Sequence, residues 1–97
     1  MDILEDLAAR IYKRYPYPQP WWSKTHYTKR CTEIYAAEQA LLRCMDKIYI
    51  DDPVDTINDY IFELEVCKNK TDNAQAIINL SIMIRALEEL VAYLKLK

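Results

Sequence analysis

The side chains best suited to catalysis are a single histidine and the cysteine nearest to it. His26 lies between Lys24 and Lys29 and has no carboxylate close in sequence to orient it. A nucleophilic thiol needs an oriented base beside it. Cys31 is the nearest thiol, but five helical positions place it about 140° around a helix from His26. The sequence therefore predicts a protein that is not an enzyme and assigns no catalytic residue.

A zinc site is the other chemistry that these residue types allow. It would need His26 with Cys31, Cys44 and Cys67. Their successive spacings lack the short paired spacing of structural zinc sites. Thiols that are buried as small apolar side chains explain the cysteines more simply. An odd number of cysteines without a CxxC pair also suits a reducing compartment. We expect no metal, no cofactor and a cytoplasmic location.

The complete absence of glycine from the 97 residues restricts the fold. Average usage near 7% would supply about seven glycines. Gly-rich phosphate loops, dinucleotide fingerprints and EF-hand loops each need a backbone position that glycine alone fills cheaply. Tight two-residue hairpins also favour glycine. The composition therefore indicates an all-α protein.

Cations and aromatic side chains are interleaved in residues 10–30, which contain no acid although the chain has a net charge of −2. Single-stranded nucleic acids are bound by this combination, through backbone contacts and base stacking. The candidate residues for such binding are Arg10, Lys13, Arg14, Lys24, Lys29 and Arg30. Nucleic-acid binding is therefore the alternative function.

Within that segment, residues 15–22 read YPYPQPWW, and we call them the strap. Their prolines remove backbone donors and favour extended backbone. One interpretation is that the strap crosses a helical bundle with Trp21 and Trp22 plugging the core. Another is that Tyr17, Trp21 and Trp22 dock a protein partner, because aromatic side chains dominate binding hot spots.

A line of carboxylates follows the next proline. Asp52, Asp55, Asp59 and Glu63 recur three or four residues apart, with Phe62 on the same outward side. Such a helix usually presents a solvated face. The line would alternatively meet the basic residues 10–30, or imitate a row of phosphates toward a nucleic-acid-binding partner.

Two helices are expected before that line. The first covers residues 2–14, where Asp2 and Glu5 have the spacing of a capping box. The second covers residues 24–49, with Ser23 or Thr25 as its cap. The apolar stripe expected to face the core on this second helix is Tyr27, Cys31, Ile34, Leu41, Met45 and Ile48.

Two more helices are expected after it. Asp52 and Pro53 begin the third, and Asn69 ends it in the left-handed conformation. The fourth begins at Thr71 or Asp72, with Asp72 and Gln75 as a capping box. Its coiled-coil type seam is Ile77, Leu80, Ile84, Leu87, Val91 and Leu94. This helix is therefore either central or a homodimer face.

The predicted fold is a single all-α domain over residues 1–97, without a membrane segment. It is a small bundle of four helices: one short N-terminal helix, the Pro/Trp strap, and three longer antiparallel helices.

The second half, DDPVDTINDYIFELEVCKNKTDNAQAIINLSIMIRALEELVAYL, resembles small uncharacterised α-helical proteins of bacterial phages and mobile elements. The resemblance implies an accessory or regulatory role exerted by binding, including inhibition of host nucleoproteins of the anti-CRISPR kind. It supplies no site residues. The leading hypothesis is a non-enzymatic protein-interaction module. Its predicted partner-binding residues are Tyr17, Trp21, Trp22, Asp55, Asp59, Phe62 and Glu63.

Overall fold

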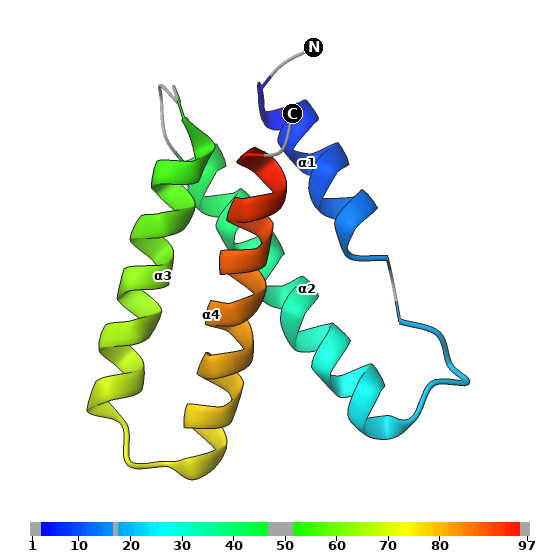
Figure 1. Ribbon diagram of the computed structural model, residues 1–97, viewed down its shortest axis with the longest axis vertical. Coiled ribbons are helices and arrows are strands. Elements are labelled where there is room, and N and C mark those ends of the chain that lie inside the picture. Colours follow the sequence, from blue (N-terminus) through cyan, green and yellow to red (C-terminus); the bar gives the residue numbers. More distant parts are fainter. Residues whose placement is uncertain (1–2, 17, 47–51, 96–97) are drawn as a thin grey trace.

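The described chain is a set of four helices connected by short segments (Figure 1). The computed structural model describes residues 3–16, 18–46 and 52–95, and these contain no strand. The helices are α1 (Ile3–Arg14), α2 (Lys24–Met45), α3 (Pro53–Lys70) and α4 (Ala74–Lys95). α3 and α4 form an antiparallel hairpin, and α2 crosses obliquely behind α4. The predicted all-α fold of one short and three longer packed helices is confirmed.

Two predicted helix starts are confirmed by hydrogen bonds. The Ser23 hydroxyl oxygen accepts from the backbone N–H of His26 over 3.2 Å at the start of α2. An Asp52 carboxylate oxygen accepts from the N–H of Val54 over 2.9 Å, and Pro53 occupies the first position of α3. These caps satisfy backbone donors that have no partner within the helix.

The prediction for the start of α4 was wrong by one to two residues. The cap is Asn73, whose side-chain oxygen accepts from the N–H of Ala76 over 3.0 Å. Thr71 acts one step earlier, because its hydroxyl oxygen accepts from the N–H of Asn73 over 3.2 Å. Asp72, the predicted cap, therefore lies between the two residues whose side chains accept these backbone hydrogen bonds.

Two predicted helix ends also differ from the structure. α3 continues through Asn69 to Lys70, and Thr71 then takes extended backbone with φ −97°. No described residue has a positive φ, so Asn69 does not adopt the left-handed conformation. α2 ends at Met45, where the N–H of Asp46 donates to the carbonyl of Leu42 over 3.1 Å, rather than at residue 49.

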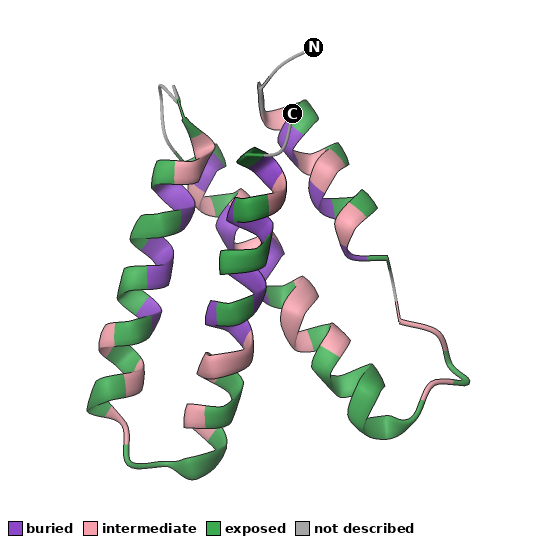
Figure 2. Ribbon diagram, viewed as in Figure 1, coloured by how far each residue is buried: buried purple, intermediate pink, exposed green. Residues whose placement is uncertain are grey.

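The core lies where α4 meets the other three helices. Figure 2 shows buried positions concentrated in the C-terminal half of α4 and in the parts of α1, α2 and α3 that surround it. The buried part of the predicted seam is Ile84, Leu87, Val91 and Leu94. α4 is therefore the central helix, and its seam is covered by the chain itself.

The predicted inner stripe of α2 was wrong for Tyr27, Cys31 and Met45, whereas Ile34 and Leu41 pack against the core. Small residues face the core instead, and Ala36, Ala37, Ala40 and Cys44 are at most 1% exposed. Small side chains let the axes of two helices approach closely, so this face fits the large residues of α4. Of the stripe, Tyr27, Cys31 and Met45 are exposed, Ile34 and Leu41 are half-buried, and Ile48 lies outside the described residues.

Tyr15 fixes the end of α1 to α4. Its side chain is 2% exposed, and its hydroxyl donates a 2.6 Å hydrogen bond to the carbonyl of Ala86. Burial raises the pKa of Tyr15 to about 12, with the neighbouring Arg14 acting in the opposite direction. The first residue of the strap thus fills the core position that we predicted for the tryptophans.

We expect the free energy of unfolding to fall as pH rises from about 10 toward 12, because the folded protein retains a phenolic proton that the unfolded chain loses near pH 10. Tyr15→Phe should flatten this decline and cost about 1 kcal/mol at neutral pH. Urea unfolding of both proteins across this range measures the effect. An equally steep alkaline decline in Tyr15→Phe would contradict it.

Candidate protein interaction surfaces

The strap presents its tryptophans outside the core. Trp21 is 78% exposed. Trp22 is half-buried, with its ring centroid 4.3 Å from that of His26 in an edge-on arrangement and the Arg30 guanidinium 6.0 Å away. The interpretation that both tryptophans plug the core was therefore wrong. Tyr17, the third predicted aromatic contact, lies outside the described residues.

Three of the six predicted nucleic-acid-binding cations interact within the chain. Arg10 lies 3.3 Å from the Asp6 carboxylate and donates to the Leu94 carbonyl. The Arg14 guanidinium lies 3.2 Å from the Glu89 carboxylate. Arg30 is mostly covered, and its Nε atom is buried without a hydrogen bond to a described residue, 3.9 Å from a Glu33 oxygen. Lys13, Lys24 and Lys29 are exposed and form no ion pair with a described residue.

A polar hollow of about 360 Å³ lies between the N-terminal part of α2 and α4. Its walls include Lys29, Glu33, Ser81 and Arg85. Glu89 closes one side, held between Arg14 and Arg85 by ion pairs of 3.2 and 3.6 Å. The charges of this hollow are largely used within the fold. Sequence reasoning missed it because α2 and α4 are far apart along the chain.

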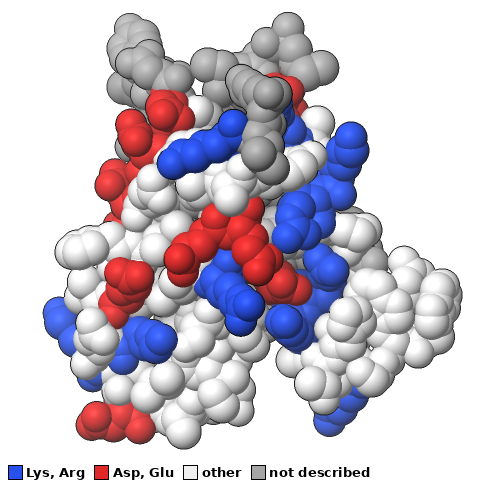
Figure 3. Space-filling view, viewed as in Figure 1, with Lys and Arg blue, Asp and Glu red and all other residues white. Residues whose placement is uncertain are grey.

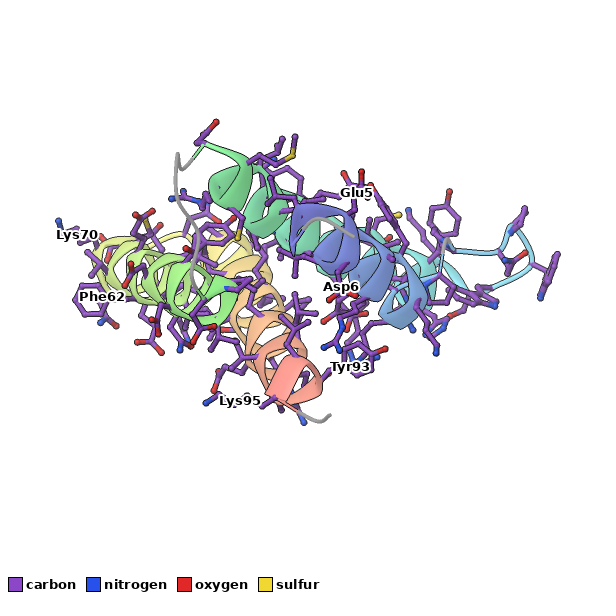
Figure 4. The ribbon with its side chains drawn as sticks, turned by 90° about the horizontal axis from the view of Figure 1, so that it is seen from above. Glu5, Asp6, Phe62, Lys70, Tyr93 and Lys95 are labelled. Atoms are coloured by element: carbon purple, nitrogen blue, oxygen red, sulfur yellow. The ribbon has the colours of Figure 1, made fainter. Side chains whose placement is uncertain are left out.

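The outward side of α3 carries carboxylates around one aromatic side chain. Phe62 is 66% exposed, and Figure 4 shows it directed away from α1, where Glu5 and Asp6 are labelled. Asp55 and Asp59 are exposed on the same side of the helix. Figure 3 shows acidic side chains along the outer edge of α3 and basic ones along α1. The structure thus does not bring the acidic line to residues 10–30.

One cation from α2 reaches the acidic line. Arg43 places a terminal nitrogen 2.9 Å from a Glu63 oxygen, and its guanidinium lies 4.1 Å from the centre of the Tyr60 ring. Burial raises the pKa of Tyr60, and Arg43 opposes that shift. A hollow of about 290 Å³ between α2 and α3 is lined by these residues together with Asp46 and Asp59. Glu63 is therefore paired with a cation, whereas Asp55 and Asp59 form no ion pair with a described residue.

The predicted partner-binding residues form two separate surfaces. Trp21 and Trp22 lie in the strap at one side of the molecule, and α3 lies at the opposite side (Figure 1). Sequence reasoning missed Arg43, since no pattern along the chain places it over Tyr60. We call the group formed by Asp55, Asp59, Phe62 and Glu63 the acidic face of α3.

The remaining candidates for chemistry are the cysteines, and in the described chain they do not gather with other possible metal ligands. Cys44 is buried, and Cys31 and Cys67 are exposed thiols. Among the described residues, no group of three or more His, Cys, Asp or Glu side chains is placed to hold a metal ion. No described helix combines the length and apolar character needed to cross a membrane.

No family model matches the chain, and neither a curated protein nor a solved structure is significantly similar to it.

The two tryptophans should differ in their effect on stability. Trp21→Ala should change the free energy of unfolding by less than about 0.5 kcal/mol, because the side chain is mostly in solvent. Trp22→Ala should cost about 1–2 kcal/mol through lost contacts with His26 and Arg30. Denaturant unfolding measures both. Equal losses would contradict the placement of the strap.

Proposed function

We propose that this protein is a non-enzymatic interaction module, a regulatory or inhibitory accessory protein that binds a macromolecular protein partner through the acidic face of α3. The observation that carries the proposal is the exposure of Phe62, the chain's one phenylalanine, among carboxylates on a rigid helix. A large apolar side chain with a charged rim is the arrangement found at binding hot spots.

The chemistry of this face selects a basic partner. Residues three or four positions apart on a helix are surface neighbours with Cβ atoms about 6 Å apart, so carboxylates at this spacing repel one another. Asp55 and Asp59 make no ion pair with a described residue, so their repulsion is relieved when a partner supplies cations. A nucleic-acid-binding protein offers such a surface, which agrees with the host nucleoprotein that the sequence resemblance implies.

The strap supports the same function as a second contact. Trp21 is 78% exposed, and the strap that carries it lies at the side of the molecule opposite α3 (Figure 1). One flat partner surface does not reach both. A partner that wraps the protein, or two partners, would use the strap as well.

Nucleic-acid binding by residues 10–30 has less support. Arg10, Arg14 and Arg30 interact with acids of the same chain, which leaves the three exposed lysines for phosphate contacts. Binding of this kind weakens steeply as salt rises. Titration with single-stranded DNA and RNA at low salt therefore separates the two functions.

We expect Asp55→Lys/Asp59→Lys to lose the partner in pull-downs quantified by mass spectrometry, because it reverses the charge of the acidic face. Phe62→Ala should weaken capture at least tenfold, as expected for a hot-spot side chain. Both sets of substitutions are at exposed positions, so circular dichroism should show an intact fold.

The matched control is Glu5→Lys/Glu88→Lys, which changes net charge equally at exposed positions of α1 and α4. It should retain the partner. If all variants retain the partner, or if the control loses it equally, the assignment of the binding site to α3 is wrong. Binding of single-stranded nucleic acid that depends on the exposed lysines Lys13, Lys24 and Lys29 would favour the alternative function.

A further inference from the structure

The outward side of α2 carries a regular seam of side chains. Its members alternate three and four residues apart, the spacing of the inner positions of a coiled coil. They are Thr28, Cys31, Tyr35, Glu38, Leu42 and Met45. Tyr35, Leu42 and Met45 are 50 to 56% exposed. We call these six residues the outer seam of α2.

The protein's own helices pack against the other sides of α2. Ala36 and Ala40 are buried on the opposite side. Arg43 extends toward Tyr60 of α3, and Lys29 and Glu33 border the hollow shared with α4. At 100° per residue, Arg43, Lys29 and Glu33 lie on the same side of α2 as the buried alanines, and the outer seam lies on the opposite side. The exposure of its large side chains shows that α1 does not cover it either, so the outer seam is available to another helix.

We propose that the outer seam is a homodimer interface in which α2 pairs antiparallel with α2 of a second copy. The inner positions of a coiled coil alternate between two types, a and d. Antiparallel pairing places each a residue opposite a d residue of the second helix. In the centred register, Cys31 faces the second copy's Leu42 and Thr28 faces its Met45. Each of these layers occurs twice, because a two-fold axis relates the copies.

The central layer fixes this register by a polar pair. Tyr35 faces the second copy's Glu38, and its hydroxyl is a donor for that carboxylate. Glu38 makes no ion pair with a described residue and lies in the middle of an otherwise largely apolar seam. A polar residue within such a seam specifies register and orientation at some cost in stability. The second copy satisfies both polar groups reciprocally.

The available surface is sufficient for such a dimer. The outer seam is about 26 Å long at 1.5 Å per residue. The large side chains of the outer seam are about half exposed. Together with Tyr27 they offer on the order of 400 Å² of apolar area. Interfaces are about 57% apolar, so the total approaches about 700 Å² per copy. A standard interface buries about 800 Å² per partner.

A cysteine pair tests the register directly. Leu42→Cys in a Cys67→Ser background should form disulfides with the second copy's Cys31 under mild oxidation and yield a covalent dimer. Within one chain, positions 31 and 42 are about 16 Å apart along the helix, too far to bridge. Ile78→Cys in the same background is the matched control, since residue 78 is equally exposed on α4. Crosslinking of Leu42→Cys no faster than that of Ile78→Cys would overturn the register.

Sedimentation equilibrium tests the interface without new thiols. The native chain should dimerise, and Leu42→Glu should raise the dissociation constant more than a hundredfold by placing two charges in the seam. Ile78→Glu is the control with an equivalent change at a similarly exposed position of α4, and its dissociation constant should match that of the native chain. A native chain that stays monomeric at millimolar concentration, or equal effects of the two substitutions, would overturn the proposal. The acidic face is tested separately, so either proposal can fail alone.

Discussion

The close contact between the alanine face of α2 and the large side chains of α4 is the constraint on which the rest of the fold depends. Ala36, Ala37 and Ala40 are essentially inaccessible, and Leu87 and Leu90 are fully buried. Alanine projects little beyond the backbone, so the two helices approach and the core volume comes mainly from α4. The N-terminal helix then completes the core with Leu7, Ile11 and Tyr15.

That constraint also determines what the surface offers. Because α2 turns its small residues inward, Tyr35, Leu42 and Met45 face solvent on the outer seam. Phe62 is directed outward from α3 in the same way, since Ile57, Ile61 and Leu64 occupy the inner side of that helix. The surface proposed for a second copy is thus separate from the surface proposed for a basic partner. Charge differs between them: carboxylates surround Phe62, whereas a single carboxylate interrupts the seam.

Local signals in the sequence were sufficient to predict where α2 and α3 begin. They were insufficient to predict which side of α2 faces the core. Ser23, Asp52 and Pro53 predict their helix starts because caps depend on neighbouring atoms. The side of α2 that faces the core depends on the distance between helix axes, which hydrophobicity along one helix does not report. For that reason the prediction placed Tyr27 and Met45 on the wrong side, although Ile34 and Leu41 do pack against the core. The spacing of Phe62 with the carboxylates predicted its outward side, but left open whether another helix covers it, and the structure shows it exposed. The Arg43–Glu63 contact needs the three-dimensional arrangement.

The orientation of α2 is the central claim. The chain has one cysteine on the outer seam of α2, one on the inner side of α2 and one on α3. Native thiol labelling of a dilute solution, read by mass spectrometry, measures it directly. We predict rapid modification of Cys31 on the outer seam and Cys67 on α3, with Cys44 protected until the protein unfolds. Protection of Cys31 in dilute solution together with rapid modification of Cys44 would mean that α2 presents the opposite face to the core, and would contradict the account.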